Sequence, residues 1–199
     1  MPQIFLISDL HFCDTDTPHD IIHRKNRRDP DTDEMYPDMA TMNADLIARW
    51  NRTVRPEDKV YSLGDFAESR GEFLNYSSRL TGKKQFLMGN YELAWDFEKQ
   101  EDRNNAGALF PIMGFLSVKN RNFLVTHDPQ DIPSRWDGWV IHGHFHNHPE
   151  YPFVDGRRKR INVSCELTGY MPVNLEFIAS LDLDRIEWME SADAAPVLW

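Results

Sequence analysis

Three histidines at alternate positions make residues 140–146, VIHGHFH, the strongest candidate for chemistry in this chain. Neutral imidazole is the commonest side-chain ligand of divalent transition metals. The apolar residues predict a buried strand, and Gly143 predicts a sharp turn or a close backbone approach at its end. His144 and His146 would then lie on the rim of a sheet, where α/β proteins carry their sites. Alone, the pattern also fits two polar loop histidines.

A second pair of candidate ligands follows the first predicted strand. Residues 4–7, IFLI, form a continuous apolar run of strand length, which is typical of a central strand buried on both faces. Asp9 and His11 come directly after it, and residues two apart on an extended backbone share a face. The pair would supply an oxygen and a nitrogen ligand to a metal. The other interpretation is a helix cap or a polar loop pair.

Polar residues also follow three later strands. Gly64-Asp65 and Gly89-Asn90 each end a predicted strand, and His127 stands alone after another. Parallel strands in βαβ units deliver their ends to the same edge of a sheet, so we expect these side chains to lie together. The complete set of predicted metal ligands is Asp9, His11, Asp65, Asn90, His127, His144 and His146.

The elements that must position these residues are predicted from hydrophobic spacing. Residues 38–54 predict a helix with Asp38 as its N-cap, because apolar residues recur there at helical spacing, and residues 72–80 predict a shorter helix. The predicted strands cover residues 4–7, 59–63, 85–88, 115–118, 123–125, 139–141, 160–164 and 174–183. Strands that alternate with helices in the first half indicate an α/β fold.

Length and composition predict one domain over residues 1–199, with a weakly ordered tail at 190–199. The formal net charge of −10 argues against a general nucleic-acid or membrane-surface binder. The two cysteines, Cys13 and Cys165, make no disulfide framework and favour a reducing compartment. We recognise no signal peptide, and no apolar run approaches the roughly 20 residues of a membrane span. We therefore expect a cytoplasmic protein.

The segment 12–37 is charged, rich in turn residues and long for a compact domain, which favours a functional loop inserted over the site. It contains a basic cluster suited to phosphate binding. The members of this cluster are Arg24, Lys25, Arg27 and Arg28. We expect His19 and Arg27 to contact the substrate. A solvated surface loop is the equally weighted alternative.

Together the motifs occur in the order D-x-H, G-D, G-N, a lone His and G-H-x-H across residues 9–146. In this order the chain resembles the calcineurin-like metallophosphoesterases, in particular their small single-domain members. The resemblance implies an α/β fold in which two facing mixed β-sheets are flanked by helices, a four-layer α/β/β/α sandwich. It also implies two divalent metal ions that share one bridging carboxylate.

The resemblance assigns the predicted ligands to the two metals. It implies Asp9, His11 and His146 for the first metal, Asn90, His127 and His144 for the second, and Asp65 as the bridge between them. Metals about 3.5–4 Å apart can activate water and clamp the phosphoryl oxygens. Four positive charges against two carboxylates leave a net charge of about +2, which suits a phosphate anion. Manganese is the favoured metal, and iron, zinc and nickel are alternatives.

One position departs from the family pattern. The family commonly has histidine after Gly-Asn, where it contacts the phosphate and assists the leaving group, and this chain has Tyr91. A tyrosine with a pKa of roughly 10 is a weak general acid near neutral pH. Tyr91 is therefore either a substrate contact or a packing residue. The change lowers the expected hydrolysis of esters with poor leaving groups and leaves the metal site intact.

These residues predict a dinuclear metal-dependent phosphoesterase that favours phosphodiesters over monoesters. A hydroxide bridging the metals would attack phosphorus in line, with Asp65, Asn90 and His144 as the catalytic residues. The expected partner is a small phosphate ester or nucleotide; nucleic acid and membranes are not expected, and the sequence specifies no oligomeric state. Two alternatives remain: a metal-containing phosphate- or nucleotide-binding protein without turnover, and a nuclease, which the net charge of −10 disfavours.

Overall fold

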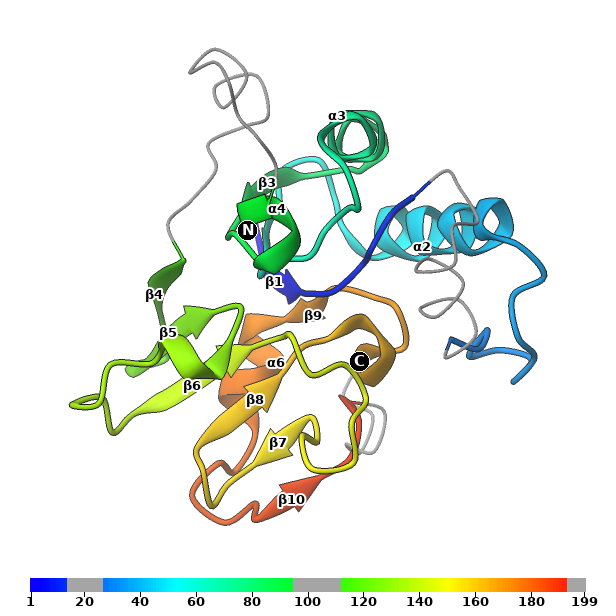
Figure 1. Ribbon diagram of the computed structural model, residues 1–199. Coiled ribbons are helices and arrows are strands. Elements are labelled where there is room, and N and C mark those ends of the chain that lie inside the picture. Colours follow the sequence, from blue (N-terminus) through cyan, green and yellow to red (C-terminus); the bar gives the residue numbers. More distant parts are fainter. Residues whose placement is uncertain (14–26, 95–111, 193–199) are drawn as a thin grey trace.

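Figure 1 shows the protein as a computed structural model, which describes residues 1–13, 27–94 and 112–192. Two mixed β-sheets form its centre. The strands of the first sheet are β1 Ile4–Ile7, β2 Lys59–Ser62, β3 Lys83–Phe86 and β9 Val173–Asn174. They lie in the order β3-β2-β1-β9, with β1, β2 and β3 parallel and β9 antiparallel to β1.

The second sheet has six strands. These are β4 Met113–Val118, β5 Arg121–Thr126, β6 Trp139–His142, β7 Val154–Asp155, β8 Arg160–Asn162 and β10 Trp188–Met189. Their order is β10-β7-β8-β6-β5-β4, in which β5, β6 and β8 are parallel and the other neighbours pair antiparallel. Each sheet therefore contains three adjacent parallel strands that deliver their carboxyl ends to one edge.

Two helices, α2 Met39–Thr53 and α3 Arg70–Arg79, cover the outer face of the four-stranded sheet (Figure 1). Phe5 of β1 packs with Trp50 of α2 and Phe73 of α3 in one buried cluster. This cluster joins the helical layer to the sheet by removing apolar surface from water.

The other buried cluster lies between the two sheets. Leu6 of β1 belongs to it, together with Val125 of β5, Ile141 of β6 and Ile161 of β8. Since successive side chains of a strand point to opposite faces, Phe5 faces the helices while Leu6 faces the second sheet. β1 is thus buried on both faces, as its continuous apolar run predicts, and the predicted α/β fold of two facing mixed sheets flanked by helices is confirmed.

Local capping explains where the helices begin. Asp38 caps α2 as predicted, because its carboxylate accepts a hydrogen bond from the Thr41 N–H at 2.7 Å. α3 begins before the predicted residue 72, because the Ser69 hydroxyl caps it by accepting from the Glu72 N–H at 3.2 Å.

The predicted strand over residues 174–183 is wrong, because most of it forms the helix α6, Leu175–Ser180. The Asn174 side chain starts this helix by accepting a hydrogen bond from the Glu176 N–H at 2.7 Å. The buried residues of α6 recur at helical spacing and pack against β1, β4 and β9. The helix therefore lies across the edge where the two sheets meet.

The segment 12–37 is only partly described. His19, Arg24 and Lys25 lie outside the described residues, so their predicted roles rest on the sequence. The described part folds back on itself through a bridge between Arg28 and Met35.

Of the predicted tail 190–199, the structure describes residues 190–192, where the Glu190 carbonyl accepts a hydrogen bond from the Phe153 N–H at 3.2 Å. Residues 193–199 lie outside the described residues. Among the helices that the structure describes, none combines the length and apolar character needed to cross a bilayer.

Candidate metal centre

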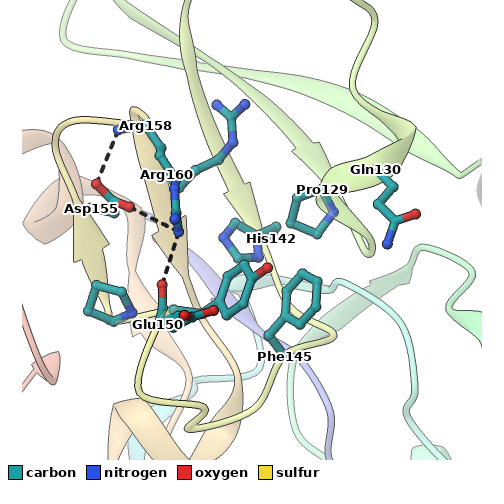
Figure 2. Close-up of a pocket in the computed structure, with 10 residues that line it drawn as sticks. Pro129, Gln130, His142, Phe145, Glu150, Asp155, Arg158 and Arg160 are labelled. Carbon is teal, nitrogen blue, oxygen red and sulfur yellow. Dashed lines mark hydrogen bonds and ion pairs between the residues drawn. The ribbon is translucent and has the colours of Figure 1, made fainter.

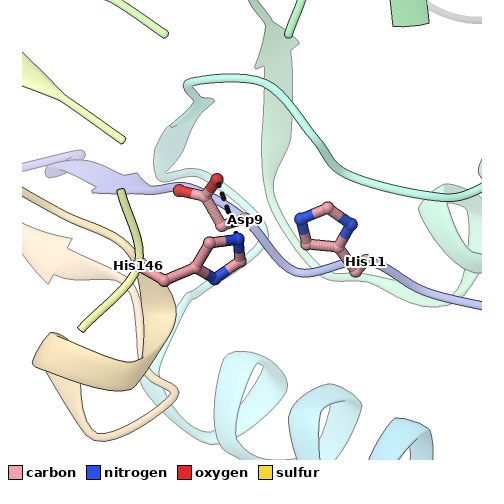
Figure 3. A group of neighbouring side chains, drawn as sticks. All are labelled: Asp9, His11 and His146. Atoms are coloured by element: carbon pink, nitrogen blue, oxygen red, sulfur yellow. Dashed lines mark ion pairs between the residues drawn. The ribbon is translucent and has the colours of Figure 1, made fainter. Parts of the chain in front are cut away.

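Six of the predicted ligands lie in two clusters at strand ends. Within each cluster the ligand nitrogen and carboxylate oxygen atoms lie within 4.8 Å of one another, so each cluster can hold a metal ion. Each has one carboxylate and two imidazoles, a donor set suited to divalent transition metals. The first cluster is Asp9, His11 and His146 (Figure 3), and the second is Asp65, His127 and His144.

The seventh predicted ligand, Asn90, lies beside the second cluster. It begins the short helix α4, Asn90–Ala94, after the end of β3. Its side-chain oxygen Oδ1 lies 3.1 Å from His127 Nε2 and 3.2 Å from His144 Nδ1. The fold therefore brings all seven predicted ligands into one region, although they come from five separate points of the chain.

Asp65 faces ligands of both clusters. Its Oδ2 atom lies 3.3 Å from His127 Nε2 in its own cluster and 3.7 Å from His11 Nε2 in the other. Its second oxygen, Oδ1, accepts a hydrogen bond from the Tyr91 N–H at 3.0 Å, which fixes the carboxylate plane. One carboxylate oxygen thus lies between the two clusters, which is the arrangement required of a bridging ligand.

Two glutamates orient the imidazoles of the first cluster. His11 Nδ1 lies 2.9 Å from Glu68 Oε1, and His146 Nδ1 lies 2.9 Å from Glu166 Oε1. A carboxylate on one ring nitrogen fixes the tautomer and raises the basicity of the other nitrogen, which is a common support for metal-binding histidines. Sequence reasoning missed both glutamates, because neither belongs to a motif.

The histidines of the second cluster are oriented differently. His127 Nδ1 lies 2.8 Å from the Leu63 carbonyl oxygen, so Nδ1 carries the proton and Nε2 faces Asp65. His144 presents Nδ1 to the cluster instead, and its Nε2 lies 3.7 Å from an Asp128 carboxylate oxygen. The His144 side chain is 29% exposed, so this cluster opens to solvent.

Five of the ligands have left-handed backbone conformations. The φ angles are 61° at Asp9, 48° at His11, 49° at Asp65, 76° at His144 and 50° at His146. Residues other than glycine adopt this region infrequently, and it persists only where surrounding structure imposes it. Its repeated use here shows that the fold holds these side chains in geometries that an unconstrained loop would not keep.

Two glycines let the backbone approach the carboxylates. A Cβ atom on Gly89 would lie 2.1 Å from Asp65 Oδ1, and a Cβ on Gly143 would lie 2.4 Å from Asp9 Oδ2. Any larger residue would displace the carboxylate or the backbone. The predicted close approach at Gly143 is thus present, and it serves the first cluster rather than the strand itself.

Asp9 also links the two sheets at the site. The His144 N–H donates to Asp9 Oδ1 and Oδ2 at 3.1 and 3.0 Å, and the Ser164 hydroxyl donates to Oδ2 at 2.8 Å. Beside it, the Ser8 N–H donates to the Val163 carbonyl at 2.9 Å, which extends β1 toward the end of β8. These bonds hold both clusters where the two sets of strand ends meet.

The comparisons with known proteins place the chain in a family. No protein-family model matches it. It is 35% identical over 187 residues to "uncharacterized protein MJ1445" of Methanocaldococcus jannaschii, and the alignment covers 91% of this chain and 92% of that protein. The chain belongs to the MJ1445 family.

The fold of this MJ1445-family chain is similar to that of solved structures. The protein of unknown function AQ665 from Aquifex aeolicus matches with a TM-score of 0.60 and 22% identity, over 90% of this chain and 98% of that one. At this identity the likeness shows a shared fold alone. A novel archaeal phosphodiesterase matches with a TM-score of 0.43 and 16% identity, over 81% and 82% of the two chains, a likeness too small to support a function.

Arg27 takes a different position from the one predicted. It was expected to contact the substrate, but its side chain is fully buried. The guanidinium donates to Glu166 Oε1 at 2.9 Å, to the Leu10 carbonyl at 2.7 Å and to the Asp9 carbonyl. These contacts leave Arg27 no surface for a substrate and make it a support of the first cluster in the MJ1445-family fold.

Glu92 is a further residue that supports the site and that sequence reasoning missed. Its buried carboxylate accepts hydrogen bonds from the N–H groups of Asp65, Phe66 and Gly89 at 2.8, 2.7 and 2.8 Å. Burial and the Asp65 charge raise the pKa of Glu92, and the three N–H donors oppose that rise. This side chain ties the turn after β2 to the turn after β3.

The electrostatics of the site favour positive charge. Burial lowers the pKa of His127, but the hydrogen bond to Asp65 and the charges of Asp9 and Asp65 outweigh it and raise that pKa to about 9. Burial also opposes protonation of His146, yet Glu166 and Asp9 raise its pKa. A site that holds protons in this way exchanges them for a bound cation.

Tyr91 contacts the site through its ring as well as through its backbone N–H. Its ring packs edge-to-face on the His11 ring, with centroids 4.8 Å apart and an interplanar angle of 87°. Packing on a ligand histidine is therefore one role of Tyr91. Its contact with the substrate stays a prediction.

Proposed function

We propose that this protein is a dinuclear metal-dependent phosphoesterase that hydrolyses phosphodiesters in preference to monoesters. The observation that carries the proposal is the position of Asp65 Oδ2, at 3.3 Å from His127 Nε2 and 3.7 Å from His11 Nε2. One carboxylate between two ligand clusters suits a pair of metals rather than two independent ions. The motif order that resembles the calcineurin-like metallophosphoesterases supports the same reaction class.

The residues present fit divalent metals. Imidazole nitrogens and carboxylate oxygens in one site suit manganese, iron, zinc or nickel, and we propose manganese. Asp9, His11 and His146 would hold one ion, Asn90, His127 and His144 the other, and Asp65 both. Bound metals would polarise the phosphoryl oxygens and supply a nucleophile from water at neutral pH.

The charge of the site suits an anionic substrate. Two divalent ions against the Asp9 and Asp65 carboxylates leave about +2. The Glu166 charge is offset by Arg27, whose Nε lies 2.9 Å from Glu166 Oε1. The second cluster, with its partly exposed His144, is where the proposed substrate would enter. The Asn90 amide beside it would orient a phosphoryl oxygen.

Tyr91 favours diesters with good leaving groups. A departing alkoxide must take a proton, and a phenol with a pKa of roughly 10 supplies it poorly near neutral pH. Nitrophenolate and similar leaving groups depart without that proton. The substrate range proposed here follows from this difference.

A binding function without turnover is the second candidate, and Tyr91 is its specific support. The ring packs on His11 at 4.8 Å between centroids, so a structural role explains the residue equally well. In that case the metals would bind a phosphate or nucleotide and release it unchanged.

The deciding experiment is an assay of the manganese-loaded protein on bis(4-nitrophenyl) phosphate and 4-nitrophenyl phosphate. We expect faster release from the diester, loss of activity on chelation and recovery when manganese is restored. Asp65→Asn should lower the rate by about 100-fold or more, because it removes the shared ligand. Phosphate binding with no turnover under manganese, iron, zinc or nickel would select the binding function.

A further inference from the structure

A cavity of about 230 Å³ lies on the outer face of the six-stranded sheet (Figure 2). Several residues that line it are close in sequence to metal ligands. Gln130 lies three residues after His127, and Phe145 lies between His144 and His146. The Phe145 ring contacts the His144 ring edge-to-face, with centroids 4.9 Å apart. A ring in the cavity wall is therefore in contact with a predicted ligand of the metal centre.

One side of this cavity is aromatic. The rings of Phe145 and Tyr151 stack in parallel, with centroids 3.7 Å apart and an interplanar angle of 10°. The Arg158 guanidinium lies 5.7 Å from the centroid of the Tyr151 ring. The Tyr151 ring thus lies between the Phe145 ring and a cation, and the wall offers apolar surface beside that cation, which suits contact with a planar ring.

Hydrogen bonds fix this wall in place. The Arg158 guanidinium donates to the Glu150 carbonyl at 3.1 Å and pairs with Asp155 at 3.5 Å (Figure 2). The Asn162 side chain donates to the Tyr151 carbonyl at 3.0 Å. The cavity is thus preformed, which lowers the entropic cost of ordering it around a ligand.

The other side of the cavity carries polar groups. His142 and Arg160 point to the outer face of the sheet, because their neighbours Ile141 and Ile161 point into the core between the sheets. The Arg160 guanidinium donates to the Lys159 carbonyl at 3.2 Å and forms no ion pair with any residue of the described chain. It keeps donors for a ligand, and Gln130 also lines the cavity.

The size of the cavity limits its occupant. Pockets for drug-sized ligands measure roughly 300–1,000 Å³. A cavity of about 230 Å³ suits one ring system rather than a whole nucleotide. Arginine and glutamine side chains read the polar edges of nucleobases, and aromatic side chains stack on their faces.

We infer that this cavity is a specificity pocket for a heteroaromatic, nucleobase-like ring of the substrate whose phosphate occupies the metal centre. The inference rests on the proposed function for the position of the phosphate. Tyr151 and Phe145 supply the aromatic wall, and Arg160 donates hydrogen bonds to acceptors on the ring edge. Substrates that carry such a ring are selected over those with a sugar or alkyl group alone.

The test compares two ligands that differ by the ring. Adenosine 5′-monophosphate and ribose 5-phosphate are titrated calorimetrically into the manganese-loaded protein. We expect the nucleotide to bind about tenfold or more tighter than the sugar phosphate. Arg160→Met and Tyr151→Leu should each lower the affinity for the nucleotide to nearly that for ribose 5-phosphate. The affinity for ribose 5-phosphate and the metal content should stay unchanged.

Arg157→Met is the matched control. Arg157 lies in the turn between β7 and β8, close in sequence to Arg160, but its side chain is 77% exposed and pairs with Glu187 at 3.0 Å. The variant should keep the full ratio. Equal affinity of the two ligands for the unaltered protein, or an unchanged ratio in Arg160→Met and Tyr151→Leu, would overturn the pocket. Because binding is measured without turnover, a protein that fails to hydrolyse diesters still gives a readable answer.

Discussion

Tyr91 is the residue at which the chain departs from the motifs of the calcineurin-like metallophosphoesterases that it resembles. Tyr91→His should speed the hydrolysis of alkyl phosphodiesters much more than that of nitrophenyl diesters, because an imidazolium can protonate an alkoxide and nitrophenolate needs no proton. General-acid help is typically worth roughly 10²–10⁴ in rate. Tyr91→Phe serves as the control for packing on His11, whose ring centroid is 4.8 Å away. Equal acceleration of both substrate classes by Tyr91→His would show that position 91 takes no part in leaving-group chemistry.

Arg27 supports the first cluster through its hydrogen bonds to Glu166 and to the Asp9 carbonyl. Arg27→Met should weaken manganese binding at that cluster by about 10–100-fold, because Glu166 and the Asp9 backbone lose the donors that position them. Equilibrium dialysis on the purified chain measures this. Arg49→Met is the matched control, since Arg49 is also buried, at 3% exposure, but pairs with Asp29, Asp31 and Asp45. Similar losses of metal in both variants would mean that Arg27 acts through general stability alone.

Among single residues, the metal ligands could be predicted from the sequence, and the side chains that hold those ligands in place could not. Asp9 and His11 are neighbours in sequence after an apolar run, so the spacing itself signals a site. Arg27 and Glu166 are 139 residues apart, and His11 and Glu68 are 57 apart. No local pattern links such pairs, because only the tertiary fold brings them together. For the same reason the basic composition around Arg27 pointed to a substrate contact where the structure has a buried support.

The strand ends are the elements that the site depends on. Gly89→Ala should sharply reduce bound metal and activity, because its Cβ would lie 2.1 Å from Asp65 Oδ1. Metal content and turnover of the purified variant measure this. Gly71→Ala, in the first turn of α3, is the control, since its Cβ would come no nearer than 3.9 Å to the Ser69 hydroxyl. A Gly89→Ala protein with two bound metals and full activity would contradict the close approach.

Strands with long apolar runs were predictable, and α6 was not. β1 is buried between two layers, so its whole sequence is apolar and its identity follows from the pattern. α6 is only 6 residues long, which is too short for helical periodicity to stand out from alternation. Its start depends on the Asn174 side chain, which accepts from the Glu176 N–H at 2.7 Å, a local bond that the pattern of apolar residues does not indicate.

At the scale of the whole molecule, metal binding should be coupled to proton release. In the metal-free protein the pKa of His127 is raised to about 9, so near pH 7.5 the imidazole is protonated. Because this pKa is about 6.5 in the unfolded chain and about 9 in the folded protein, protonation of His127 stabilises the folded state. The stabilisation is complete at pH values below about 6.5 and is lost as the pH rises through 9. Manganese must displace the proton to reach Nε2.

Calorimetric titration in buffers with different ionisation enthalpies measures this release. We expect about one proton to leave near pH 7.5 and fewer as the pH passes 9. His127→Ala should abolish that dependence together with binding at the second cluster. A binding enthalpy that is the same in every buffer at pH 7.5 would contradict the coupling.

The central claim is that two metals share Asp65, and anomalous scattering from manganese-soaked crystals tests it most directly. We predict two peaks about 3.5–4 Å apart, one among Asp9, His11 and His146 and one among Asn90, His127 and His144, with Asp65 Oδ2 within bonding distance of both. Asp65→Asn crystals, as the comparison, should lose at least one peak. A single peak in the unaltered protein, or two peaks of which only one contacts Asp65, would contradict the account.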